Sequence, residues 1–176
     1  MAGILQGHVT IQRRGDMDYR KLENMVRELA DQYVAIGILE ATRQYPDSTA
    51  TLGEVAMTNE FGTETAKGTV AIPSRSFLRT PIDKAIEPLV LLQENLLNRV
   101  FDEKMTVAKS LARMGAEVVR IMQTAIVKRI DPPLRPRTLQ LRKERGITGT
   151  IPLLATRWLY QNIHFAVRKI TGSIDK

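Results

Sequence analysis

The stretch that most constrains the fold runs from Asn59 to Pro81, with the sequence NEFGTETAKGTVAIPSRSFLRTP. Gly62 follows a short helical segment and is placed to take the positive φ that ends a helix. Pro73 stops a short apolar run, Val70–Ile72, because its ring fixes φ and removes a backbone donor. Thr80–Pro81 predicts a new helix start, with threonine as N-cap and proline at the first helical position. The stretch therefore separates a mixed α/β unit from a long helical region.

The chain before this stretch predicts strands and helices in alternation. Ile4–Arg14 alternates loosely between apolar and polar residues, as an edge strand or a flexible arm does. Asp18–Asp31 has one apolar stripe at helical spacing. Val34–Leu39 carries β-branched residues at alternate positions and predicts a central strand. Thr49 or Thr51 is expected to cap a short helix that ends near Phe61.

The chain after Pro81 predicts two long helices. One apolar stripe runs from Ile82 to Val100, and a second runs from Val107 to about Ile130. Pro88 must kink the first helix or restart it, because proline cannot supply the backbone hydrogen bond. Lys104–Thr106 breaks or bends the segment, so the two helices form either one rod or a hairpin. We favour the bend or hairpin.

The C-terminal part predicts short elements. Arg135–Gly149 holds at most one short helix, at Thr138–Arg145, and Pro152 is expected to open a last helix that ends near Asn162. His164–Ile170 alternates like a strand and can pair with Val34–Leu39. The prediction is a single α+β domain over residues 1–176. A small mixed β-sheet is packed by an N-terminal helix and two long central helices, with extended loops.

Composition narrows the function classes. The chain has 176 residues and 43% hydrophobic content, as globular proteins do, and no cysteine for disulfides or thiolate metal sites. No apolar run approaches the length of a membrane span and the N-terminus lacks a signal-peptide layout, so we expect no membrane association. Only His8 and His164 are present, and no metal or nucleotide motif occurs. We therefore expect no enzyme activity, no catalytic or metal-binding residues and no cofactor.

Positive charge is concentrated in one segment. The net charge is +7, and residues 128–145 hold seven basic residues against two acidic ones, a net of +5. This segment belongs to a basic loop region, residues 128–152, rich in proline and glycine. A solvated loop is one interpretation, and contact with DNA phosphates or an acidic partner is the other. The residues proposed for that contact are Arg135, Arg137, Arg142 and Lys143.

A family resemblance is carried by two sets of residues. The first is Asn59, Glu60, Phe61, Gly62 and Thr63, followed by Ile72, Pro73, Arg75, Phe77, Leu78 and Arg79. The second is Pro133–Leu134, Thr138, Lys143 and the segment Pro152–Ile163, where Ala155, Arg157 and Asn162 replace the usual Asp, Gly and Ser. In this order they resemble the tail-completion proteins of tailed bacteriophages, also called neck, head–tail joining or virion-morphogenesis proteins.

The resemblance implies a structural role in the virion. Such a protein is a subunit of a homo-oligomeric ring, a hexamer in tails, at the head–tail junction. Its neighbours are neck, tail-terminator or tail-tube proteins, with non-specific contact to passing DNA left open. It would be found in the virion and assemble in the host bacterial cytoplasm. The alternative function is a basic DNA-binding module.

Several motif residues are candidates for subunit contacts. Arg75 and Arg79 either lie on a solvated face or bind carboxylates of an adjacent subunit, which suits their fork geometry. Phe61 and Phe77 are expected in the core, although Phe77 can instead insert into a neighbour. The candidate subunit or partner interface residues are Asn59, Glu60, Phe61, Arg75, Phe77, Arg79 and Trp158. The polar loop Thr63–Thr69 is expected to be mobile until assembly orders it.

Overall fold

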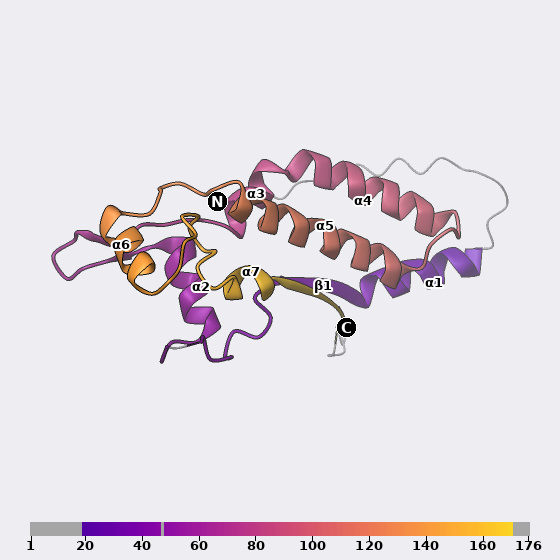
Figure 1. The fold of residues 1–176 in the computed structure, drawn as a ribbon. Helices are drawn as coiled ribbons and strands as arrows, with labels where there is room; N and C mark the ends of the chain where they lie inside the picture. The colour runs from indigo at the N-terminus through magenta and orange to yellow at the C-terminus, as the bar shows by residue number, and fades with distance from the viewer. Residues whose placement is uncertain (1–18, 47, 171–176) are drawn as a thin grey trace.

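The computed structural model describes residues 19–46 and 48–170, so the expected arm at residues 4–14 lies outside the described residues. Figure 1 shows an elongated molecule in which a pair of long helices lies along a two-stranded sheet. The elements, in chain order, are α1 (Tyr19–Ala30), β1 (Gln32–Gly37), α2 (Leu52–Phe61), β2 (Thr63–Glu64), β3 (Val70–Ile72), α3 (Arg79–Lys84), α4 (Ile86–Phe101), α5 (Val107–Val127), α6 (Pro136–Glu144), α7 (Trp158–Gln161) and β4 (His164–Lys169).

The sheet joins the two ends of the described chain. β1 pairs antiparallel with β4, and Ile36 lies opposite Phe165. This confirms the predicted pairing and the α+β class. Two details differ from the prediction. The first strand ends at Gly37, whose φ of 133° is open to glycine but not to other residues. In addition, both strand pairs among the described residues are antiparallel, so the sheet is not mixed.

α5 packs directly on this sheet because a glycine lets the two layers approach. A Cβ added at Gly115 would lie 2.6 Å from the ring of Phe165 on β4. Only a residue without a side chain fits between this helix and the strand. The contact fixes the helix on the sheet.

The two long helices form a hairpin, as favoured from the sequence. α4 ends at Phe101, and the Thr106 side chain caps α5 by accepting a hydrogen bond from the Lys109 amide. Figure 1 shows α4 and α5 running side by side in opposite directions. Pro88 is the third residue of α4, where its missing N–H has no intrahelical partner to lose. The helix therefore restarts at Ile86 instead of kinking.

The core has two parts. Residues from α2, α4, α5 and α7 surround Phe77, and a smaller cluster closes the turn end of the hairpin. Full burial of a side chain such as Phe77 is worth about 1.5–3 kcal/mol. The main cluster consists of Leu52, Ala56, Phe77, Leu89, Val118, Met122, Ile126, Leu159 and Ile163.

Three helix boundaries differ from the predictions. α3 begins at Arg79 and its N-cap position is Leu78, so Thr80 does not cap it. The last helix covers only Trp158–Gln161, because Leu153 and Arg157 have positive φ values of 65° and 59° that interrupt a helix after Pro152. The basic region does contain one short helix, α6, which begins at Pro136. No helix in the described parts of the chain is long and apolar enough to cross a membrane.

Candidate functional site

The first motif of the sequence is assembled around a buried carboxylate, Glu60. Its Oε1 accepts hydrogen bonds from Ser76 Oγ at 2.6 Å and the Arg79 amide at 3.1 Å. Its Oε2 accepts from the amides of Phe77 at 2.8 Å and Leu78 at 3.0 Å. These amides precede or begin α3, so Glu60 acts as the cap that Thr80 was expected to provide. One side chain of α2 thus determines where the next helix starts.

The environment keeps Glu60 ionised. Burial raises the pKa of its carboxyl, but hydrogen bonds from Ser76 and from the amides of Leu78, Arg79 and Phe77 outweigh it and leave the pKa below its ordinary value. Backbone contacts extend the same junction: the Arg75 amide donates to Asn59 O at 2.6 Å, and Ser74 Oγ donates to Glu60 O at 2.7 Å. The two halves of the motif therefore form one structural unit.

Two of the candidate interface residues are buried in this junction. Glu60 is 4% exposed and Phe77 is fully buried. The prediction that Phe77 fills the core is confirmed. The prediction that Glu60 and Phe77 contact a neighbouring subunit is inconsistent with their burial, because both side chains are already occupied within the chain.

Between the two halves, β2 and β3 form a projecting hairpin. Gly62 ends α2 with a φ of 76°, and a Cβ there would lie 2.7 Å from the Ser74 amide. The predicted loop, residues 63–69, is therefore one strand and a tight turn, closed by a hydrogen bond from the Thr65 amide to Thr69 O at 2.8 Å. Val70 and Ile72 on the other strand are exposed. Mobility of this segment stays a prediction.

Phe61 and Arg79 lie on the surface beside the hairpin. The prediction that Phe61 fills the core is wrong: its ring is exposed and lies 5.7 Å from the Arg79 guanidinium carbon. Phe61 is the last residue of α2, immediately before Gly62 ends the helix. Both residues remain available to a neighbour.

Arg75 connects the motif to the basic region. It is only 6% exposed, and its Nε and Nη2 donate hydrogen bonds to the carbonyls of Pro132 at 2.8 Å and Pro133 at 3.1 Å. Burial lowers the pKa of Arg75, and the neighbouring charges of Arg142 and Arg135 lower it further. The prediction that Arg75 lies on a solvated face is wrong, because its side chain is buried and bonded to the carbonyls of Pro132 and Pro133. Contact with carboxylates of an adjacent subunit stays a prediction.

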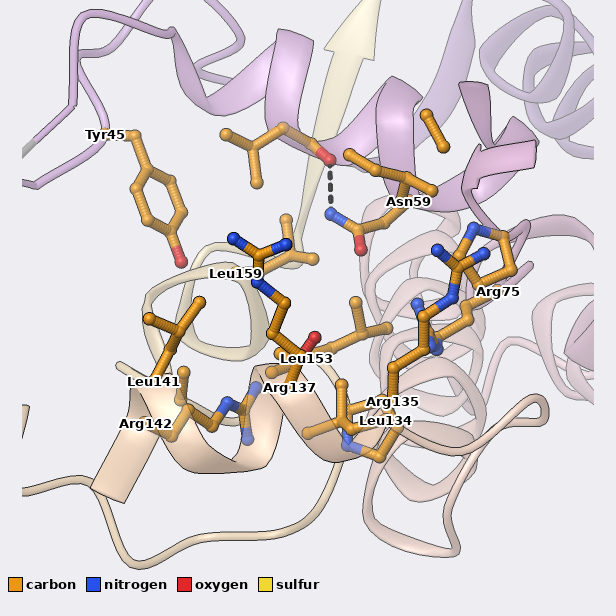
Figure 2. Close-up of a pocket in the computed structure, with 17 residues that line it drawn as sticks. Tyr45, Asn59, Arg75, Leu134, Arg135, Arg137, Leu141, Arg142, Leu153 and Leu159 are labelled. Atoms are coloured by element: carbon orange, nitrogen blue, oxygen red, sulfur yellow. Dashed lines mark hydrogen bonds between the residues drawn. The ribbon is translucent and has the colours of Figure 1, made fainter. Parts of the chain in front are cut away.

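These arginines line one cavity, which we call the arginine pocket. It has a volume of about 470 Å³ and lies between α2, β3, α6 and residues 152–155. Figure 2 shows Arg137 reaching from α6 into the space between Tyr45 and Asn59. The charged lining residues are Arg75, Arg135, Arg137 and Arg142, and the apolar walls include Ile72, Leu134, Leu141 and Leu153.

Among the described residues, the guanidiniums of the arginine pocket meet only neutral acceptors. Arg135 Nη2 donates to Val70 O at 3.0 Å, and Arg142 Nη1 donates to Gly149 O at 2.8 Å and Ile151 O at 3.0 Å. Arg137 has no hydrogen bond or ion pair in the part of the chain that the structure describes. None of the described lining residues is Asp or Glu. The pocket therefore concentrates positive charge without a counter-charge from the described part of the chain.

The remaining candidates add no charge to the arginine pocket. Lys143 is exposed on α6 but does not line the cavity. Asn59 lines it, with its Nδ2 held by Val55 O at 2.7 Å. Trp158 is half-buried, with the Arg43 guanidinium 4.6 Å from its ring centroid. Packing thus accounts for most of the Trp158 surface.

Sequence reasoning missed the pocket as a unit. Tyr45, Leu153 and Arg75 belong to it, yet they are far apart in the chain and share no local pattern. The one available signal was the density of arginines near α6. Among residues 19–46 and 48–170, no group of three His, Cys, Asp or Glu side chains could hold a metal ion.

Comparison with protein-family models, curated proteins and solved structures finds no match to this chain.

Proposed function

We propose that this chain is a structural subunit of a bacteriophage virion, one copy in a ring at the head–tail junction. It acts in tail completion or head–tail joining by presenting shaped surfaces to its neighbours. The ring is a hexamer, and it contacts neck, tail-terminator or tail-tube proteins. Assembly takes place in the host bacterial cytoplasm, and DNA passing through the ring is contacted without sequence preference.

One observation carries the proposal. The two halves of the motif that resembles the tail-completion proteins meet through Glu60, which binds the backbone at the start of α3. The residues behind the resemblance therefore work together in the fold, as expected for a motif that defines an architecture. The same junction carries the exposed apolar residues Phe61, Val70 and Ile72 on and beside the hairpin.

The outward surfaces also suit a subunit that is enclosed by others. Exposed apolar residues occur on α1, on the β2–β3 hairpin and on α4, three separate regions of the molecule. Scattered single apolar residues are normal on a monomer, but groups of them typically mark interaction surfaces. A subunit inside a ring needs at least two such surfaces, one for each neighbour.

The alternative is a DNA-binding module, which the arginine pocket and the exposed Lys143 favour. Contacts with phosphates release counterions, so such binding falls steeply as salt rises. For a neck subunit we expect weak, sequence-independent binding of duplex DNA that is lost at moderate salt. Tight, sequence-selective and salt-tolerant binding by the isolated protein would favour the alternative.

A complementation assay tests the proposed role. A phage whose copy of this gene is disrupted should accumulate separate heads and tails, and the wild-type chain supplied in trans should restore joined particles. Phe61→Ser is an informative variant, because this side chain is exposed and its removal spares the buried core. Joined, infectious particles in the absence of the chain would contradict the proposal.

Changing all four basic candidates together (Arg135, Arg137, Arg142 and Lys143) is a poor test of contact with DNA or an acidic partner. Arg135 and Arg142 hold the backbone at Val70, Gly149 and Ile151, so their removal also loosens the fold. Arg137 and Lys143 have no partner in the described chain and differ in position, one in the pocket and one outside it. Comparing the single variants Arg137→Ala and Lys143→Ala therefore distinguishes binding in the arginine pocket from a general effect of surface charge.

A further inference from the structure

The arginine pocket has unused capacity to bind an anion. A guanidinium offers five N–H donors, and the carbonyls that contact Arg75, Arg135 and Arg142 leave donors free on each of them. Arg137 has all of its donors free toward the described chain. Arginine stays charged in proteins, so four positive charges around one concavity, with no carboxylate among the described lining residues, favour a negatively charged occupant.

The walls of the pocket indicate that the occupant is a protein segment. Ile72, Leu134, Leu141 and Leu153 supply apolar surface beside the guanidiniums, and Leu141 is 45% exposed. Concave sites with apolar walls and a few convergent polar groups bind ligands that have both characters. Surfaces that bind DNA are more polar than this. The fitting chemistry is carboxylate next to aliphatic side chain.

The chain itself carries a segment with this chemistry. Glu87, Val90, Leu91 and Glu94 follow the i, i+3, i+4, i+7 spacing of one helix face on α4, and we call them the α4 face. All four are exposed, Leu91 at 66%. Neither Glu87 nor Glu94 has a hydrogen bond or ion pair with the described residues. In a chain of net charge +7, these unpaired carboxylates are the natural complement of the pocket.

The two surfaces belong to different parts of the molecule. Figure 1 shows α6, which contributes to the arginine pocket, at one end, while α4 extends over the opposite half. A contact between them joins unlike surfaces of two copies, which is a heterologous, head-to-tail contact. Such contacts propagate from copy to copy and close into a ring when the rotation permits.

We infer that the α4 face of one copy docks in the arginine pocket of the next copy. Val90 and Leu91 lie against the apolar walls, and Glu87 and Glu94 pair with the guanidiniums, including that of Arg137. The docking mode is a helix in a groove, anchored at four positions of one face. The inference rests on the proposed function only for closure into a ring, because the contact itself concerns two copies of this chain.

Cysteine cross-linking tests the contact directly, since the chain contains no cysteine. Leu91→Cys and Leu141→Cys proteins are mixed in equal amounts and oxidised, and a disulfide-linked heterodimer is expected. Val127→Cys replaces Leu141→Cys in the control mixture, because Val127 is similarly exposed at the end of α5 but lies outside the pocket. At least tenfold less heterodimer is expected there.

Charge reversal provides a second test of the same contact. Arg137→Glu in the Leu141→Cys protein should lower the heterodimer yield at least tenfold, whereas Lys143→Glu on the same helix should leave it within twofold. Glu87→Arg with Glu94→Arg in the Leu91→Cys protein should also lower the yield at least tenfold, because it sets two positive charges against the arginines of the pocket. Circular dichroism checks that each variant folds, as expected for exposed side chains without partners in the described chain.

Three results would overturn the inference. The heterodimer is absent, it forms equally with the Val127→Cys control, or it is insensitive to Arg137→Glu. Duplex DNA binding that is abolished by Arg137→Glu, in a protein that gives no heterodimer, would assign the pocket to DNA instead. Rings seen by electron microscopy without this cross-link would overturn the contact and leave the proposed function standing. A specific heterodimer, formed by a chain that is dispensable for head–tail joining, would overturn the proposed function and leave the contact standing.

Discussion

Replacing Glu60 by glutamine should destabilise the protein severely without changing side-chain size. The carboxylate accepts four hydrogen bonds, two at each oxygen. Glutamine keeps one oxygen and turns an NH₂ group toward two donors, so two bonds to a charged group are lost. Each such bond is worth about 1.5–3 kcal/mol. Because the Ser76 hydroxyl can rotate to accept, we expect a loss of about 3 kcal/mol in the free energy of unfolding.

The assay is urea unfolding followed by the fluorescence of Trp158, the single tryptophan, which packs against the main core cluster. Glu64→Gln is the matched control, because Glu64 is exposed on β2 without a partner in the described chain, and it should stay within about 0.5 kcal/mol of wild type. A Glu60→Gln protein as stable as the control would refute the capping role.

The effect of Glu60 should also depend on pH. Its pKa in the folded protein is lowered, so its contribution is fully present above the unfolded value of about 4.3 and is lost as pH falls through the folded pKa. The difference in stability between wild type and Glu60→Gln should therefore be constant near neutral pH and shrink below about pH 4. A difference that grows in acid would contradict this assignment.

Three further predictions concern the backbone. Gly115→Ala should cost about 1–2 kcal/mol by urea unfolding despite its better helix propensity, since the new Cβ would meet the Phe165 ring at 2.6 Å; an unchanged midpoint would refute this. Arg157→Gly should raise stability by about 0.5 kcal/mol, because Arg157 has a left-handed φ of 59°, and a loss would contradict that account. Amide hydrogen exchange at residues 63–69 should be fast in the free subunit and slower in assembled particles. Equal protection in both states would count against ordering on assembly.

The strand and helix predictions succeeded where the hydrophobic pattern is local. Alternation at both ends of the chain located β1 and β4, and apolar stripes with the break at residues 104–106 located the hairpin of α4 and α5. The capping box at Thr51 with Glu54 is likewise readable from spacing alone. These features depend on residues a few positions apart.

The site was less predictable because its interactions span long distances in the sequence. Glu60 caps a helix that starts 19 residues later, so Thr80 was the better local candidate. Arg75 binds carbonyls 57 and 58 residues away, and no pattern in the sequence indicates that pairing. Buried charged residues that serve the fold cannot be told from interface residues until burial is known.

The most direct test of the central claim is to locate the chain in the particle. Electron microscopy of virions that carry a gold-labelled tag on this chain should show the label in a ring at the junction of head and tail, and particles lacking the chain should separate there. Label elsewhere on the particle, or none on intact and infectious virions, would contradict the proposed role.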